Sequence, residues 1–600
     1  MKISKLFPFA CVALMMTACA SDKEEIGNGT KPGSDPQYLA VNIVNVGATP
    51  TARATKKNNI ISPVPAYVRA TPTTRATDDY ENGIKEESTI KKVRFYFFNG
   101  DGSPYLIKNP GITGVEGGET KNWLEASPTD DSSTSGTPSQ TEEKITKTVL
   151  VINGIQSAAP AAIVAVVNPE TVDAATLKNG GTMRLSELRY SAVGSQFYKK
   201  DATGKVSDFV MSNSVYVNAG EDVCASLVAG HVTTSPETAE TKPVNLYVER
   251  VVAKVTADVD KTAFKVGDGT DWDATKYGTI APVGKSGEYD VYAVIDGWGL
   301  ADENGKAEVE KQVNKTWADG TLGFTPWTTA DYHRCFWETS VAFDLVVGGN
   351  QPVNPTFNQL NANMKDVLYT LPNTPGSKVT DLKNNDLTKF AVAATLKYKD
   401  ASGNWHNAEI CRYNGVSILG IDNLKKQVAL TFSQYYTSTD GTHYTQLSKD
   451  DIDFKEPNGT MQQYRVTPTL ANDPAGTKKY YTKTTTGTTS TFTDVDKATV
   501  LAAIEADKAE IRKDGRAYYY VPIKHLGSTD ANADAIAEYG IVRNHFYKIT
   551  LSGIKGFGTP VYDPDKVVSP AVPTYENTFL AARVQVLQWR VVNQNASLGD

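Results

Sequence analysis

Short runs of strand-forming residues, each followed by turn residues, constrain this chain more than any other feature. Residues 93–98 read Val-Arg-Phe-Tyr-Phe-Phe and are followed by Asn-Gly-Asp-Gly. The first run is typical of a strand, and the second tolerates the positive φ angles of a tight turn. The composition agrees, with 46 Gly, 29 Pro and 29 Tyr against 7 Met, because Gly and Pro punctuate turns while Tyr favours pleated surfaces. The sequence therefore predicts an all-β protein.

The same pattern recurs along the chain and is interrupted once. Further strands are expected at residues 147–152, 161–167, 244–255, 390–398, 427–432 and 517–523. Residues 496–513 depart from it, because Val500, Leu501 and Ile504 stand near helical spacing after an Asp suited to the N-cap. We expect one short amphipathic helix there, and a Thr-rich loop at residues 481–493.

Length and charge limit the partners. The 600 residues leave room for several domains, since a domain holds roughly 100–200 residues. The formal charge of −7 and the pI near 5.6 argue against the basic surface that phosphate recognition requires. We expect no nucleic-acid partner.

The N-terminus has the layout of an export signal. Lys2 and Lys5 precede an apolar stretch that ends in Met-Thr-Ala before Cys19, too short for a permanent membrane helix. Residues 16–19 resemble a bacterial lipobox, in which the Cys becomes the lipidated first residue, and residues 21–25 resemble the acidic export signal of Bacteroidetes surface lipoproteins. The prediction is a signal peptide over 1–18 and a lipid on Cys19. The alternative is an ordinary secretory signal in which Cys19 is incidental.

A single strand then stands between two linkers. Leu39, Val41 and Ile43 alternate along residues 38–45 and share one face of a strand. The linker after it contains Arg-Ala-Thr three times, beginning at Arg53, Arg69 and Arg75. Compositional bias in a Thr- and Ala-rich linker would explain the repeat, but an exposed Arg bond in a linker is also a preferred site for a trypsin-like protease.

No motif for catalysis or cofactor binding is present. The chain lacks phosphate-binding Gly-rich loops, a nucleophile elbow and a zinc-protease helix motif. The pair His333 and Cys335, and the Asp residues 268, 271 and 273, come nearest to metal sites, but coincidence and turn formation explain them better. We predict no enzyme, no cofactor and no metal. Cys224, Cys335 and Cys411 form no disulfide or metal pattern and are expected to be buried as small apolar residues.

Four ordered stretches together resemble the Bacteroidales major fimbrial subunit family, the fimbrillins or type V pilins. The stretches are the lipobox with its strand and Arg-Ala site, Val-Glu-Arg-Val-Val-Ala-Lys-Val at 248–255, the segments 518–525 and 542–549, and the terminal run 584–595 with Trp589. The resemblance implies two Greek-key, transthyretin-like β-sandwiches, with the one accessory helix in the second. It divides the chain into a signal peptide 1–18, a propeptide 19–75, an N-terminal sandwich 76–243 and a C-terminal sandwich 244–600.

The resemblance also implies how the chain matures. Cleavage between Arg75 and Ala76, with Arg53 and Arg69 as alternatives, would release the strand of Leu39, Val41 and Ile43. Another subunit would refill the groove with a donor strand made of Val584, Val586, Leu587, Trp589 and Val591. The alternation changes phase near Val586 and Leu587, which predicts a bulge or a change of layer there. The alternative is an ordinary last strand of its own sandwich.

The implied function is structural. The chain would be a pilus subunit that reaches the cell surface as an outer membrane lipoprotein carrying palmitate, is cut by an Arg-specific or trypsin-like protease, and polymerises with identical or related subunits. His545 and Arg543 are assigned to folding. The length and the insertions in the second half keep an alternative open, a surface-anchored adhesin or carbohydrate-binding lipoprotein acting as a tip or accessory subunit.

Overall fold

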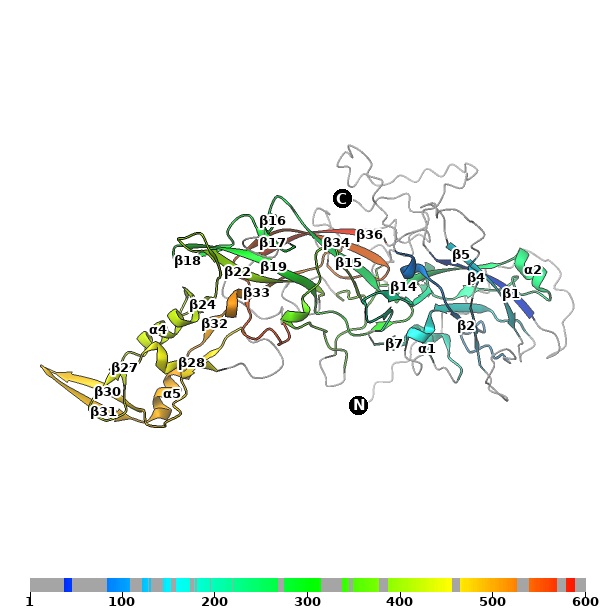
Figure 1. Ribbon diagram of the computed structural model, residues 1–600. Coiled ribbons are helices and arrows are strands. Elements are labelled where there is room, and N and C mark those ends of the chain that lie inside the picture. The colour runs from blue at the N-terminus through cyan, green and yellow to red at the C-terminus, as the bar shows by residue number, and fades with distance from the viewer. Residues whose placement is uncertain are drawn as a thin grey trace, which may run out of the picture.

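The computed structural model is an elongated, mainly β protein (Figure 1). It describes residues 37–45, 84–107, 121–130 except 128, 144–152, 158–172, 177, 181–267 except 195 and 219–220, 275–314, 337–344, 349–376, 387–455, 464–525, 539–568 and 579–588. The large sheet that contains β1 lies at one end, a second β unit lies in the middle, and a smaller module projects at the other end.

The N-terminal sheet has nine strands, in the order β3-β2-β6-β10-β14-β1-β5-β4 with β13 added to β6. Their bounds are β1 (Gln37–Asn45), β2 (Val93–Phe98), β3 (Trp123–Ala126), β4 (Thr129–Asp130), β5 (Lys144–Ile152), β6 (Ala162–Val167), β10 (Met211–Asn213), β13 (Ser226–Leu227) and β14 (Val244–Arg250). Every residue of β2 and of β6 is buried, which explains why β6 reads as a continuous apolar run and β2 as one interrupted only by Arg94. The strands predicted at 38–45, 93–98, 147–152 and 161–167 are confirmed.

Short elements complete this unit. They are η2 (Lys85–Ser88), η3 (Pro169–Thr171), α1 (Leu185–Arg189), α2 (Pro236–Thr241), β7 (Ala192–Val193), β8 (Lys199–Lys200), β9 (Val206–Ser207), β11 (Tyr216–Asn218) and β12 (Glu221–Val223). Strand β7 pairs with β20 (Ala307–Glu308), which follows the N-terminal sheet in the chain. Ala307 and Val309 are buried in the N-terminal core, so this later segment packs against the N-terminal unit.

The second unit is built on two sheets whose apolar faces share one core. One has the order β21-β15-β34-β36, with β15 (Ala253–Val259), β21 (Val367–Thr370), β34 (His545–Lys555) and β36 (Phe579–Gln588). The other has eight strands, β16 (Phe264–Val266), β17 (Tyr277–Thr279), β18 (Gly284–Ser286), β19 (Tyr289–Ala301), β22 (Lys389–Lys399), β23 (Trp405–Asn407), β33 (Arg516–Pro522) and β35 (Thr559–Pro560). Its outer face is covered by η6 (Phe357–Gln359) and the segment 561–568. The strands predicted at 390–398 and 517–523 are confirmed.

The predicted strand 244–255 is two strands in different sheets. Its first part, β14, pairs with β1 and β10 in the N-terminal sheet, while β15 pairs with β21 and β34. Val251 and Val252 between them are buried in the N-terminal core. The strand Val244–Arg250, which the predicted boundary before residue 244 assigned to the C-terminal sandwich, thus lies in the N-terminal sheet. The domain limits and the Greek-key connections remain predictions.

Residues 410–511 form a module with its own apolar core, inserted between β23 and β33. Its elements are β24 (Ile410–Tyr413), β25 (Val416–Leu419), α4 (Ile421–Thr431), β26 (Tyr435–Ser438), β27 (Thr445–Gln446), η7 (Lys449–Asp451), β28 (Ile452–Lys455), β29 (Thr467–Leu470), β30 (Lys479–Thr486), β31 (Thr489–Val495), α5 (Lys497–Glu505) and β32 (Ala509–Ile511), with η8 (Lys513–Gly515) directly after it. The described residues of the module include two α-helices, α4 and α5, where one was expected.

Three expectations for this module need correction. The segment 427–432, expected as a strand, lies largely in α4, because Leu424 and Val428 bury the same helical face. The predicted helix is α5, capped by Asp496, but it ends at Glu505 and Ile511 lies in β32. The expected loop 481–493 lies in a hairpin of β30 and β31, with Gly487 at positive φ in its turn.

Candidate functional site

The candidate assembly site is the position of β1 inside the N-terminal sheet. β1 runs parallel to β14, from Val41 beside Val244 to Asn45 beside Val248. On its other side it runs antiparallel to β5 over its whole length, from Gln37 opposite Ile152 to Asn45 opposite Lys144. β1 is thus an interior strand, and its removal would leave the backbone groups of two neighbouring strands unpaired.

The side chains of β1 fill the centre of the core. Leu39, Val41 and Ile43 are each 0% exposed. On the adjoining strands Leu150 and Ile152 of β5, and Leu246 of β14, are buried in the same core. Alternate residues of a strand point to one face, so the period-2 pattern in the sequence is what directs these three side chains inward. Without β1, the structure would expose an apolar groove between β5 and β14.

Contacts at the start of β1 tie it to the rest of the unit. The Tyr38 amide donates to the Thr233 carbonyl at 2.8 Å, and the Thr233 amide donates back at 2.9 Å. Thr233 lies just before α2, so this bridge adds a contact with a surface turn to the pairing of Gln37 and Tyr38 with β5.

The C-terminal strand β36 lies at the edge of the smaller sheet of the second unit. It pairs antiparallel with β34, with Val584 opposite Ile549, Val586 opposite Tyr547 and Leu587 opposite Phe546. The register is continuous through Val586 and Leu587, so the bulge predicted there is misplaced. The irregularity falls instead between Leu551 and Gly553 of β34.

Several predicted site residues lie outside the described part of the chain. They are Cys19, Arg53, Arg69, Arg75, Ala76, Trp589 and Val591, together with the weak metal candidates His333, Cys335, Asp268, Asp271 and Asp273. Lipidation, cleavage and strand donation therefore remain predictions. Cys224 and Cys411 are buried, as expected.

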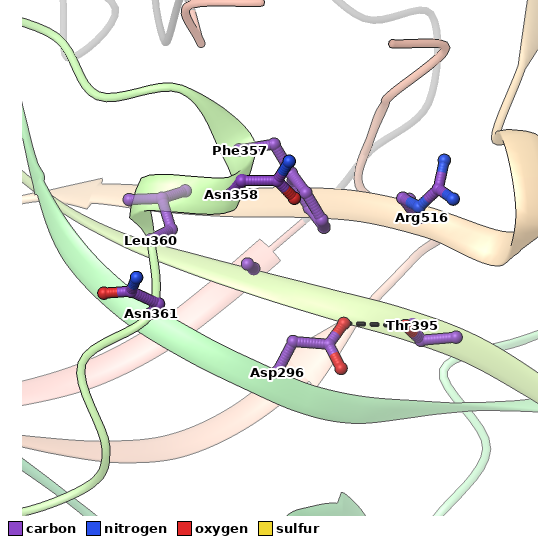
Figure 2. Close-up of a pocket in the computed structure, with 8 residues that line it drawn as sticks. Asp296, Phe357, Asn358, Leu360, Asn361, Thr395 and Arg516 are labelled. Carbon is purple, nitrogen blue, oxygen red and sulfur yellow. Dashed lines mark hydrogen bonds between the residues drawn. The ribbon is translucent and has the colours of Figure 1, made fainter. Parts of the chain in front are cut away.

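The second unit contains a pocket of about 260 Å³ on the outer face of its larger sheet (Figure 2). Its lining residues come from β19, β22, β33 and the segment around η6, and are Asp296, Phe357, Asn358, Leu360, Asn361, Ala393, Thr395 and Arg516. This pocket belongs to a different unit from the β1 groove.

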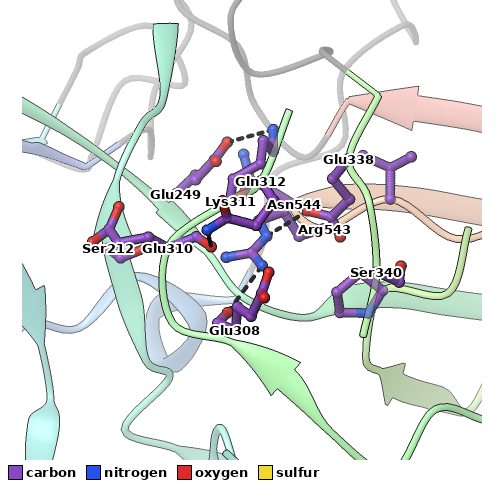
Figure 3. A network of polar contacts seen from close by, with 12 residues as sticks. Ser212, Glu249, Glu308, Glu310, Lys311, Gln312, Glu338, Ser340, Arg543 and Asn544 are labelled. Atoms are coloured by element: carbon purple, nitrogen blue, oxygen red, sulfur yellow. Dashed lines mark hydrogen bonds and ion pairs between the residues drawn. The ribbon is translucent and has the colours of Figure 1, made fainter. Parts of the chain in front are cut away.

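A buried polar network joins the two units (Figure 3). Lys311 Nζ lies 3.1 Å from Glu249 Oε2 of β14, and both side chains are fully buried. Arg543, just before β34, donates from Nε to Glu338 at 2.6 Å and from both Nη atoms to the carbonyls of Glu308 and Val309 at 3.0 Å. The family-like stretches around residues 249 and 543 therefore meet at the junction, where buried ion pairs link the two units.

Asn544 and Arg250 add a second link beside it. The Asn544 amide donates to the Val252 carbonyl at 3.0 Å. Arg250 Nε donates to the Glu87 carbonyl at 2.7 Å, and its Nη1 lies 3.3 Å from Asn544 Oδ1. Asn544 has a φ of 58°, a left-handed conformation that Asn tolerates better than most residues. These contacts support the structural role assigned to this segment.

Burial shifts the titration of the groups around the junction. Burial lowers the pKa of His545 to about 4, and its Nδ1 lies 2.8 Å from the Arg543 carbonyl, which can only accept. Burial also lowers the pKa of His525 well below its usual range, and raises the pKa of Glu310 well above its own. The two imidazoles are therefore held neutral at physiological pH. Sequence reasoning missed Lys311, Glu338 and Glu310, since no local pattern distinguishes them from surface charges.

The described residues show no group of three or more His, Cys, Asp or Glu side chains able to hold a metal ion. Among the helices of the described segments, none has the length and apolar character required to cross a membrane.

Comparison with known proteins identifies a family at the C-terminal end. Residues 512–595 match the family described as major fimbrial subunit protein type IV, fimbrillin, C-terminal. No curated protein sequence matches the chain.

Solved structures of fimbrial and adhesion proteins are similar to it over most of its length. A fimbrilin from Porphyromonas gingivalis is 11% identical, with 93% of this chain and 99% of that chain covered and a TM-score of 0.34. The C-terminally truncated tip fimbrial protein Mfa3 from the same species is 9% identical, covering 92% and 100%, with a TM-score of 0.30. A cell adhesion protein from Parabacteroides distasonis is 11% identical, covering 94% and 99%, with a TM-score of 0.35.

The family assignment rests on the matched residues, which run from the end of the projecting module through β33, β34 and β36. They include the segments around Tyr518, His545 and Val584 on which the sequence resemblance was based. The resemblance is confirmed for this part of the chain: residues 512–595 match the C-terminal fimbrillin family.

Proposed function

We propose that the chain is a fimbrial subunit that is exported as a lipoprotein through Cys19, cut after Arg75, and polymerised by donor-strand exchange at the cell surface. The observation that carries the proposal is the position of β1. It completes the core of the N-terminal unit as an interior strand, and the three Arg-Ala-Thr sites all lie between it and β2. Cleavage at any of them would separate β1 covalently from the rest of the sheet.

The groove left behind would require a strand with a matching apolar face. Backbone hydrogen bonds would supply affinity and alternate side chains would fill the pockets. The C-terminal segment has the same spacing, because Leu587, Trp589 and Val591 repeat at every second residue as Leu39, Val41 and Ile43 do. β36 pairs on one side only, so its release would break one strand pair. Such a contact is head-to-tail and does not close, and the expected product is a filament.

Cleavage with an Arg-specific protease tests this proposal. Incubation of the precursor should yield oligomer ladders that resist mild denaturant, and N-terminal sequencing of the product should begin at Ala76. Cleavage that is complete but leaves a monomer with an intact C-terminus would contradict the proposal.

Truncation separates the parts of the donor segment. Removal of residues 589–600 leaves β36 as the structure describes it, whereas removal of residues 581–600 also takes most of β36. Both truncated subunits should accept β1 cleavage without polymerising. Filaments of wild-type length from the longer truncation would rule out this donor segment.

The projecting module favours a second candidate, an adhesive tip or accessory subunit. It has its own core and ends in the β30–β31 hairpin, where all residues from Lys483 to Thr491 are exposed. Glycan-array retention of the uncut protein, lost when residues 481–493 are replaced by a short Gly-Ser turn, would support this candidate. Retention that persists in the variant would remove the hairpin from consideration.

A further inference from the structure

The pocket on the outer face of the second unit is built by two local distortions of the sheet. Between β19 and β22 the register shifts, so that Ile295 faces Ala394 and Gly297 faces Ala393. Asp296 is the extra residue of this bulge. Bulges re-aim side chains, and here the Asp296 carboxylate joins the residues that line the pocket.

Glycines beside the bulge let the opposite wall approach. A Cβ on Gly297 would lie 2.5 Å from the Leu360 carbonyl oxygen, and a Cβ on Gly299 would lie 2.8 Å from the Leu360 side chain. Any larger residue would push the segment 357–361 away from the sheet. The bulge and the glycine pair together create a hollow that a regular sheet face would not have.

The side of the pocket that the sheet forms, facing the segment 357–361, is polar. Thr395 and Arg516 are direct partners in the pairing of β22 with β33, so their side chains share a face. Thr395 Oγ1 donates to Asp296 Oδ2 at 2.6 Å. Figure 2 shows Asp296 and Thr395 on one side of the pocket, Asn358 on the opposite side and Arg516 at one end.

Both charged groups already have a counter-ion. Lys276 Nζ lies 2.7 Å from Asp296 Oδ1, and Arg516 Nη2 lies 2.7 Å from Asp514. An anionic or cationic ligand would have to compete with these partners. A neutral ligand with several hydroxyl groups would not, because it can accept from the other N–H groups of Arg516 and donate to the remaining lone pairs of Asp296.

The remaining surfaces fit one side of a pyranose ring. Phe357, Leu360 and Ala393 are apolar residues that line the pocket, so they offer contact for C–H groups. The side-chain amides of Asn358 and Asn361 add donors and acceptors, and Asn358 Nδ2 already uses one N–H to donate to Asp565 at 2.7 Å. The volume of about 260 Å³ is below the roughly 300–1,000 Å³ of sites for drug-sized ligands. From these features we infer that the pocket binds one neutral sugar residue of a glycan.

The inference does not rest on polymerisation, since the pocket lies in the second unit and β1 lies in the first. Binding is therefore measured on the uncut, full-length monomer. The probes are methyl glycosides of neutral hexoses, with N-acetylneuraminic acid and glucose 6-sulfate as anionic comparisons, followed by saturation-transfer NMR and titration in the millimolar range. The result expected is saturation transfer to at least one neutral hexoside.

Substitutions locate the site. Arg516→Ala and Asn358→Ala should each weaken binding, the first by roughly tenfold or more because a charged donor is lost. Asn358 is exposed and lies on η6, so its variant tests the site even if Arg516→Ala disturbs β33. Lys285→Ala, on the same sheet with a 67% exposed side chain, is the matched control and should bind as wild type.

The outcomes separate clearly. Binding of anionic sugars alone, no binding of any neutral hexoside, or binding unchanged in both pocket variants would each overturn the inference. Arg516→Ala subunits should still polymerise after cleavage. A failure of wild-type polymerisation would count against the proposed function and would leave the sugar-binding result standing.

Discussion

Shortening the buried side chains of β1 should destabilise the N-terminal unit selectively. Leu39 and Ile43 are 0% exposed and packed in the core between β5 and β14. Replacing either with Ala removes buried methyl groups and leaves a cavity, which costs about 2–5 kcal/mol. Together the three inward side chains of β1 contribute about 5–9 kcal/mol at about 1.5–3 kcal/mol each.

That sum is comparable with the whole stability of a typical domain, about 5–15 kcal/mol. β1 thus contributes enough to the stability of the N-terminal unit that a subunit without it would need a replacement strand. The assay is hydrogen exchange followed by mass spectrometry in the uncut protein, because it reports opening free energies unit by unit. In Leu39→Ala or Ile43→Ala, amides of β2 and β6 should lose about 2–5 kcal/mol of protection, while amides of β19 and β22 should be unchanged.

Val151→Ala supplies the matched control. Val151 lies on β5 opposite Tyr38 but is 48% exposed, so its truncation should change stability by no more than about 0.5 kcal/mol. If Ile43→Ala were as mild as Val151→Ala, β1 would not be part of the core, and the reasoning that links its removal to assembly would fail.

Three further predictions concern the junction and the module. Arg543→Ala should lower the free energy of unfolding, measured by denaturant titration, by about 3–5 kcal/mol, because Glu338 would stay buried without its partner. The double variant Arg543→Ala with Glu338→Ala should lose less stability than the two single variants added together. Burial lowers the pKa of His545 to about 4 in the folded state, so the unfolded state takes up a proton first as the pH falls below about 6.5. Between pH 7 and pH 4 the free energy of unfolding of the wild type should therefore fall by about 3 kcal/mol more than that of His545→Asn. Equal losses in the two proteins would contradict the lowered pKa. Asp496 caps α5 by accepting from the Ala498 amide at 2.9 Å, so Asp496→Ala should cost the module about 1 kcal/mol in hydrogen-exchange protection, with Asp494→Ala as the exposed control.

The sequence predicted strands well where apolar residues either mark one face of a strand or form a continuous buried segment. In β1, Leu39, Val41 and Ile43 repeat at every second residue, and β2 is a continuous buried run; both were placed within a residue or two. The segment 427–432 failed because its short apolar stretch is compatible with either element. The residues that decide for a helix lie earlier, with Gly420 at positive φ before α4 and Leu424 one turn ahead of Val428.

The features that define the sites are mostly non-local. No turn residue marks the change of sheet at Val251 and Val252, so the run 244–255 read as one strand. Arg543 meets Glu338 across 205 positions of sequence, and no spacing rule reaches that far. The pocket depends on a bulge at Asp296 that forms only when β19 pairs with β22.

The central claim, that the place of β1 is taken by the C-terminal segment of another subunit, is tested most directly by mixing two subunits that each lack one half of the exchange. A cleaved subunit truncated after Gln588 offers a groove and no donor, whereas a second subunit with Arg53, Arg69 and Arg75 replaced by Ala keeps β1 and offers a donor alone. The mass of the mixture after protease treatment is then measured by light scattering. The account predicts a one-to-one dimer and no longer species; two persistent monomers, or self-association of the truncated subunit alone, would contradict it.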